Sequence, residues 1–99
     1  MKKNNYVVTS TPEELAEALG LSAADGLEIK IKSDLNDKII ETIKRKKLTH
    51  AQVAKLAGTS RTRITALVGR NTKDISTDLM LRIISSLGVE ARLVFKRAS

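Results

Sequence analysis

The stretch at residues 49–71, THAQVAKLAGTSRTRITALVGRN, constrains the fold of this chain more than any other. Residues 50–57 have small and apolar side chains at helical spacing, and Thr49 precedes them as a candidate N-cap. Gly58 follows, and a glycine can take the left-handed conformation that ends a helix without a Cβ clash. Ser60 then offers a hydroxyl that can cap a second helix. The sequence therefore predicts two short helices joined by a tight turn.

Two short helices in this arrangement match the helix-turn-helix plan, in which the second helix enters the DNA major groove and the first crosses the backbone. Small residues at Ala54 and Gly58 are expected to let the two helices cross closely, because larger side chains would overpack the junction. The residues expected to serve packing in this unit are Ala51, Val53, Ala54, Gly58, Ile64 and Leu67.

The positive charge of the chain is concentrated around this unit. The 99 residues have a formal net charge of +7 at pH 7, yet residues 1–32 hold four basic and five acidic side chains. Residues 42–73 hold nine basic side chains and no acidic one. Such a segment attracts phosphates and makes affinity fall steeply with salt. A solubilising surface is the alternative interpretation, but coincidence with the two-helix unit favours nucleic acid.

Size and composition restrict the class of protein. Ninety-nine residues suit one domain, and with one Phe, one Tyr and no Trp the core must be mainly aliphatic, which favours a helical fold. The absence of cysteine excludes disulfides, thiolate metal sites and cysteine nucleophiles. No apolar run reaches the roughly 20 residues that span a bilayer, and the start lacks the apolar region of a signal peptide. We therefore expect a cytoplasmic protein without membrane contact.

Two helices are predicted before the two-helix unit. Thr11-Pro12-Glu13-Glu14 is typical of a helix start, and this helix should end near Leu19. Residues 22–33 are ambiguous, because Leu27, Ile29 and Ile31 alternate as in a strand. Apolar residues also recur every four positions from 27 to 43, which favours a helix that ends near Lys46 with a possible break at Ser33.

A further helix and a strand are predicted after the unit. Residues 70–75 resemble a polar loop, and Ser76 or Thr77 can cap a helix that ends near Leu87 and turns Leu79, Leu81, Ile83, Ile84 and Leu87 to the core. Residues 89–95 alternate as in a half-buried strand, which needs a partner from the same chain or from a second copy. The fold class is therefore mainly α, a bundle of about five helices with a short C-terminal β-strand. We divide it into an N-terminal extension (1–32), a DNA-binding domain (33–88) and a tail (89–99).

Residues 48–71 resemble the Cro/CI-type helix-turn-helix family, also called the XRE family. They follow its pattern of L-T-Q-x-x-hydrophobic-A, then A-G, then S-x-x-x-I and a final hydrophobic-x-G. The resemblance extends more weakly over residues 36–88, and it is closest to small HigA-type antitoxin regulators. It implies a lambda-repressor-like bundle and a DNA-binding role.

The resemblance also implies which side chains contact DNA. Base contacts fall on Arg61, Thr62 and Ala66, and Arg61 can make a bidentate contact with a guanine. The expected phosphate contacts are His50, Ser60, Arg63, Thr65, Arg70 and Asn71. His50 departs from the glutamine that is common in the family. Ser60 has an alternative interpretation as a cap, Arg70 and Asn71 have one as ordinary loop residues, and the directions of Arg63 and Thr65 stay open.

The leading functional hypothesis is a sequence-specific repressor that binds an inverted repeat in double-stranded DNA as a homodimer, with half-sites roughly 34 Å apart. The resemblance adds an antitoxin that blocks a RelE/HigB-like ribonuclease toxin. Alternatives are a regulator without a toxin and an interaction module with little DNA role.

An enzyme is disfavoured by the sequence, and no cofactor or metal is expected, because no phosphate loop, ligand cluster or nucleophile–base pair is visible. The acidic residues Glu13, Glu14, Asp34 and Asp37 are explained as helix-start residues. RNA binding is disfavoured because stacking aromatic side chains are scarce.

Overall fold

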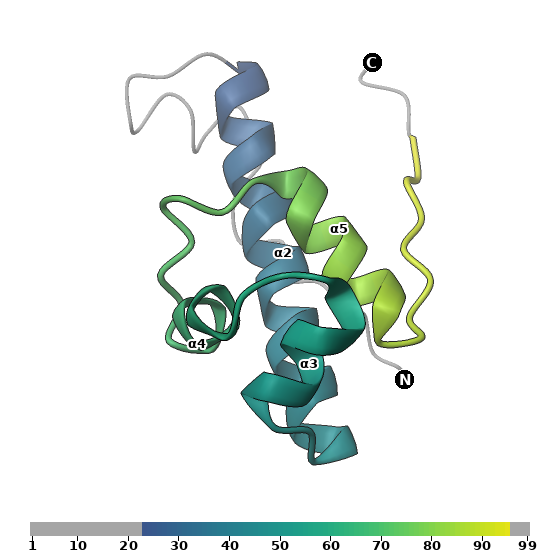
Figure 1. Cartoon of the computed structure of the whole chain (residues 1–99). Coiled ribbons are helices and arrows are strands. Elements are labelled where there is room, and N and C mark those ends of the chain that lie inside the picture. The colour runs from purple at the N-terminus through teal and green to yellow at the C-terminus, as the bar shows by residue number, and fades with distance from the viewer. Residues whose placement is uncertain (1–22, 96–99) are drawn as a thin grey trace.

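A computed structural model describes residues 23–95, which contain the four helices α2 (Ala23–Lys46), α3 (His50–Ala57), α4 (Arg61–Val68) and α5 (Thr77–Ser86). Figure 1 shows α2 as a long rod with α5 lying across it, while α3 and α4 are grouped beside the C-terminal half of α2. The expectation of a mainly helical bundle is confirmed for this part of the chain. The helix predicted at residues 11–19 lies outside the described residues.

The helix interpretation of residues 23–33 is confirmed, because α2 runs over 24 residues without a break at Ser33. Its apolar stripe is not buried evenly. Ile39 and Ile43 are in the core, whereas Leu27, three turns earlier, is 47% exposed. The helix ends where Lys47 takes a left-handed conformation with φ of 55°, and the Leu48 amide then donates to the Ile43 carbonyl at 3.1 Å. The C-terminal half of α2 is therefore the part that supports the rest of the bundle.

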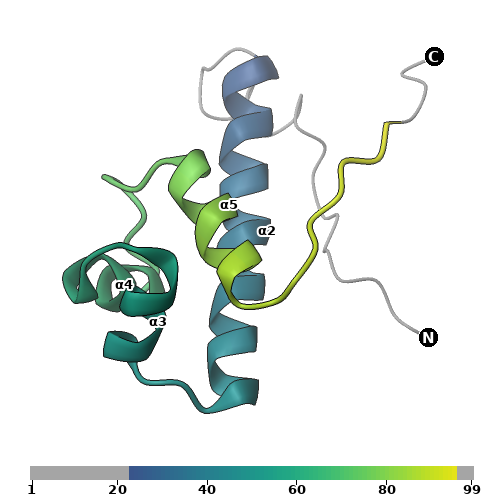
Figure 2. The ribbon, with the colours of Figure 1, turned by 45° about the vertical axis from the view of Figure 1, so that its right-hand side comes forward.

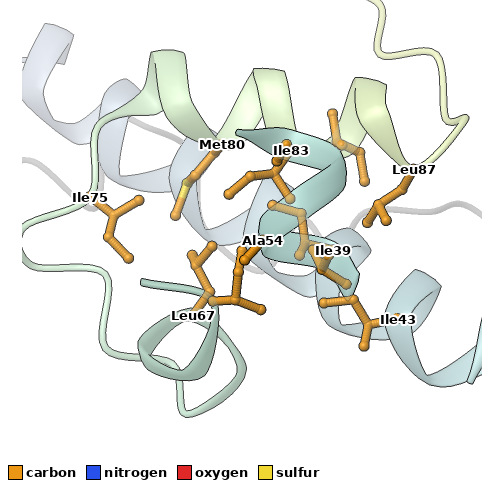
Figure 3. Packing of buried hydrophobic residues seen from close by; sticks show 12 residues of the cluster. Ile39, Ile43, Ala54, Leu67, Ile75, Met80, Ile83 and Leu87 are labelled. Atoms are coloured by element: carbon orange, nitrogen blue, oxygen red, sulfur yellow. The ribbon is translucent and has the colours of Figure 1, made fainter. Parts of the chain in front are cut away.

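One hydrophobic cluster joins all four helices. In Figure 3, Ile39 and Ile43 of α2 face Ala54 of α3 and Leu67 of α4, and side chains of α5 close the cluster from the other side. The buried side chains of this cluster are Ile39, Ile43, Val53, Ala54, Ala57, Ile64, Leu67, Ile75, Met80, Ile83, Ile84 and Leu87. Each helix of the two-helix unit is thus fixed to the same core.

The face that α5 buries differs in part from the expected one. Met80 is fully buried although it was not expected in the core, whereas Leu81 is 42% exposed. Ser76 caps the helix by accepting from the Leu79 amide at 3.1 Å, and this start places Met80, Ile83, Ile84 and Leu87 on one face at helical spacing. Ile75, expected in a polar loop, is only 3% exposed. The loop before α5 therefore contributes to the core.

Two lysines of α2 hold the segment that contains α5. Lys46 Nζ donates to the Leu87 carbonyl at 2.7 Å, at the C-terminal end of α5, where a positive charge is favourable. Lys32 Nζ donates to the Thr72 carbonyl at 3.2 Å, in the loop between α4 and α5. The long helix is therefore connected to both ends of residues 72–87.

The predicted C-terminal strand is not present in the described tail. Residues 89–95 have no regular secondary structure, and Figure 2 shows them leaving the end of α5 as an irregular ribbon. Leu93, Val94 and Phe95 are 75%, 87% and 89% exposed. A strand is defined by a hydrogen-bonded neighbour, and no described segment of this chain forms a ladder with the tail. An alternating sequence is therefore not sufficient to form a strand.

Candidate nucleic-acid interface

The start of α3 is built as the sequence predicts. Thr49 is the N-cap, its hydroxyl accepts from the Gln52 amide at 3.1 Å, and the Gln52 side-chain oxygen accepts from the Thr49 amide at 2.8 Å. This reciprocal capping box satisfies two amides that the helix cannot bond internally. It fixes the position of His50, the first residue of α3.

The turn between α3 and α4 depends on the conformation of Gly58. Gly58 has φ of 70°, in the left-handed region, and the next amide, that of Thr59, donates to the Ala54 carbonyl at 3.0 Å. A Cβ at Gly58 would meet no atom within 4 Å, so the expectation that Gly58 allows close helix crossing is wrong. Its backbone conformation explains the glycine, whereas Ala54, only 6% exposed, is the small residue packed inside the bundle.

Ser60 begins α4 as an N-cap. Its side-chain oxygen accepts from the Arg63 amide at 3.1 Å, so the capping interpretation is confirmed. The hydroxyl can still donate its hydrogen to another acceptor, because accepting at the cap uses only a lone pair. Capping and a phosphate contact are therefore compatible at this residue.

The second helix of the unit separates packing residues from exposed ones. Ile64 and Leu67 are 0% exposed and face the core. Four neighbours on the same helix are exposed, namely Arg61, Thr62, Arg63 and Thr65. Within the described residues, neither Arg61 nor Arg63 forms an ion pair, so both guanidinium groups can serve an external anion or base.

The burial of Ala66 and Ala51 bears on two of the roles expected from the sequence. Ala66 is half-buried and packs against the hydrophobic cluster, which limits it to a small apolar contact with any ligand of α4. Ala51, which the sequence suggested as a packing residue, is exposed on α3.

His50 and Thr65 are brought together by the fold. The Nδ1 atom of His50 lies 2.9 Å from Oγ1 of Thr65, so the first turn of α3 is hydrogen-bonded to the middle of α4. His50 is half-buried and Thr65 is exposed. Both were expected as separate phosphate contacts, and sequence gave no signal that they would pair across 15 positions.

Arg70 also has a partner that sequence reasoning missed. Its Nη1 atom lies 2.5 Å from Oδ1 of Asp37 on α2, and both side chains are more than half exposed. Asp37 was interpreted as a helix-start residue, but it lies inside the continuous α2, so that interpretation is wrong. Arg70 has φ of 64°, and the amide of the exposed Asn71 donates to the Ala66 carbonyl at 2.8 Å. This exposed ion pair links the residues just after α4 to α2, and the buried side chains of both helices supply most of the packing between them.

Other kinds of site find no support among the described residues. They contain no group of three or more His, Cys, Asp or Glu side chains that could hold a metal ion. None of the helices in residues 23–95 is both long and apolar enough to cross a membrane.

Comparison with known proteins identifies the family. A family model for a helix-turn-helix domain matches residues 13–96, which include all four described helices. The searches of curated proteins and of solved structures found no match. The match covers far more than half of the chain, and it agrees with the capped pair α3 and α4 and with the exposed basic face of α4. The chain therefore belongs to a helix-turn-helix domain family and is a DNA-binding protein.

Proposed function

We propose that this protein is a sequence-specific transcriptional regulator of the Cro/CI type that represses its target as a homodimer in the cytoplasm. The observation that carries the proposal is the exposed face of α4, where Arg61 and Arg63 are unpaired within the described residues. The helix that presents them is capped by Ser60 and fixed to the core by Ile64 and Leu67. A rigid, cationic helix of this kind suits the major groove.

The proposed contacts divide into base readers and phosphate contacts. Arg61, Thr62 and Ala66 would read bases, and Ala66 would offer only its methyl group to a thymine. The phosphate contacts would come from His50, Ser60, Arg63, Thr65, Arg70 and Asn71. Arg70 would have to share its guanidinium between Asp37 and a phosphate, and its five donors permit this. We assign this DNA-binding role to residues 33–88.

A salt titration of DNA binding tests the proposal. The operator can be selected from a pool of random duplexes by the wild-type protein and then used in fluorescence anisotropy. Arg63 and Arg70 give four cationic phosphate contacts in a dimer, so we expect affinity to fall roughly 100-fold between about 50 and 200 mM salt, because the arginine side chains displace counterions condensed on the DNA. An affinity that does not change with salt would contradict a phosphate-contacting surface.

A homodimer is proposed because one recognition helix contacts few base pairs, so two half-sites are needed for specificity. The exposed Leu93, Val94 and Phe95 support it, since an apolar tail with unpaired backbone groups can form a strand with a second copy. Saturation at two chains per inverted repeat in the same titration is the expected stoichiometry. Saturation at one chain would contradict the dimer.

An antitoxin role is proposed as a second function of the same chain. Its support is the resemblance to HigA-type regulators, together with Leu27 and Ile29 of α2, which are 47% and 39% exposed and lie outside the helix-turn-helix unit. These side chains offer apolar area to a RelE/HigB-like toxin. Co-expression with the neighbouring open reading frame should give a stable complex and relieve growth arrest. If neither occurs, the protein is a stand-alone regulator.

A further inference from the structure

We propose that Thr65 is a positioning residue that sets the protonated nitrogen of His50. The Thr65 hydroxyl lies 2.9 Å from His50 Nδ1, and a hydroxyl that donates across this contact leaves Nε2–H as a donor for a DNA phosphate. The inference rests on the proposed function, because it assumes that His50 lies beside the DNA backbone. It assigns Thr65 an indirect role in place of a phosphate contact of its own.

The other bonds of Thr65 leave its hydroxyl hydrogen available for His50. A threonine inside a helix often donates to the carbonyl four residues earlier, as Thr42 does to Lys38 at 2.7 Å. Among the described residues, Thr65 makes no such bond, and its hydroxyl has His50 as its only side-chain partner. Its hydrogen is therefore available to Nδ1. An Nδ1 that accepts a hydrogen bond in the neutral ring requires the proton to be on Nε2.

The contact works in both charge states of the imidazole. When the ring is neutral, the Thr65 hydroxyl donates to Nδ1, and when it is protonated, Nδ1–H donates to the Thr65 oxygen. Nε2 carries a hydrogen in both of these states. A neutral ring with its proton on Nδ1 would instead donate to the Thr65 oxygen, and its Nε2 lone pair would repel a phosphate. A phosphate beside Nε2 therefore favours the state in which Thr65 donates, and the hydroxyl stabilises that state.

The same bond links a backbone contact to the recognition helix. His50 begins α3 and Thr65 lies in the middle of α4. The imidazole of His50 therefore links a phosphate bound at Nε2 to α4, the proposed base-reading helix. Thr49 and Gln52 fix the histidine end through the capping box, and Ile64 and Leu67 fix the threonine end through the core. Both partners are held by rigid elements, which favours one ring orientation.

Nuclear magnetic resonance of the full chain tests the protonation state directly, since the sequence contains one histidine and its imidazole signals are unambiguous. Nitrogen-15 long-range correlation spectra of the free protein should show the neutral ring as the Nε2–H tautomer, with Nδ1 accepting a hydrogen bond. In Thr65→Val the Nδ1 shift should move to that of an unbonded nitrogen. An Nδ1–H tautomer in the wild type would overturn the inference whether or not DNA binds.

A double-mutant cycle tests the connection to DNA. The probe is a short duplex of arbitrary sequence, because phosphate contacts carry no sequence information. His50→Phe should weaken binding about tenfold, the loss of a hydrogen bond to a charged group, and Thr65→Val about two- to fivefold. In the His50→Phe background Thr65→Val should have no further effect, because Thr65 acts through the ring. Additive losses would overturn the positioning role.

Two further variants complete the cycle. His50→Gln should retain most of the affinity, because its amide can accept from Thr65 and donate to a phosphate. Thr77→Val is the matched control, since it removes a threonine hydroxyl that bonds Glu28 at the start of α5, and it should leave affinity unchanged. If the wild type does not bind the duplex, the proposed function fails, while the spectra still report on the hydrogen bond between Thr65 and His50.

Discussion

Ile64→Ala is expected to lower the free energy of unfolding by about 2–5 kcal/mol, because it removes a fully buried side chain and leaves a cavity in the cluster shared by four helices. A small domain has a total stability of about 5–15 kcal/mol, so this single change removes a large share. Urea denaturation followed by circular dichroism measures the effect.

Ile64→Val is the matched variant for this experiment. It keeps the branched shape and removes one methyl group, so it should cost about 0.5–1.5 kcal/mol. Equal stability of the alanine and valine variants would contradict the burial of Ile64, because alanine loses more buried apolar atoms even where the site collapses. Ile64 has 0% exposure and cannot itself contact DNA, so its effect on binding should follow from stability alone. The valine variant, which stays folded, should therefore bind DNA as the wild type does.

The parts of the fold that could be predicted from sequence are those that depend on neighbours along the chain. Thr49, Ser60 and Ser76 cap the helices that follow them, and each bond spans three residues. Gly58 ends α3 in the left-handed conformation, as a glycine at that position indicates. The repeat of apolar residues every four positions correctly favoured a helix over a strand before residue 33. Local rules therefore located the described helices, including the two that carry the candidate site.

What could not be predicted depends on residues that are far apart in sequence. The pair Asp37–Arg70 spans 33 positions, and the Lys46–Leu87 contact spans 41. Neither contact has a sequence pattern, because each is created when α2 packs against the segments that follow it. The same applies to His50 and Thr65, whose residue types suggested two independent phosphate contacts. These contacts between distant residues therefore become visible only when the helices are packed together.

The tail shows a different limit of sequence reasoning. Alternation over residues 89–95 describes a surface that could lie on a sheet, but the neighbour needed to form one is not specified by the tail itself. The pattern of apolar residues therefore indicates a capacity for pairing and leaves the partner undetermined. Within residues 23–95 the tail has no pairing partner, and its side chains Leu93, Val94 and Phe95 are exposed.

Arg61→Ala is expected to cost about 1–3 kcal/mol of binding at the selected operator, a loss of roughly 5- to 150-fold, and to relax specificity. Arg61 is the first residue of α4, is exposed, and has no ion-pair partner in residues 23–95, so its guanidinium is free to bond a guanine. Anisotropy titrations of the operator and of an unrelated duplex measure the ratio of the two affinities. That ratio should fall in Arg61→Ala.

Arg63→Ala distinguishes base reading from a general effect of charge. It removes the same kind of side chain as Arg61→Ala, two residues later on the same helix. As a phosphate contact, Arg63 should affect operator and unrelated duplex alike, leave their ratio unchanged, and reduce the salt slope by about one. Arg82→Ala, an exposed arginine of α5 outside the proposed site, controls for the loss of one positive charge. If Arg61→Ala and Arg63→Ala lowered both affinities equally, α4 would be a cationic surface without a base reader at Arg61. The specificity would then have to come from Thr62, from Ala66, or from the shape of the DNA.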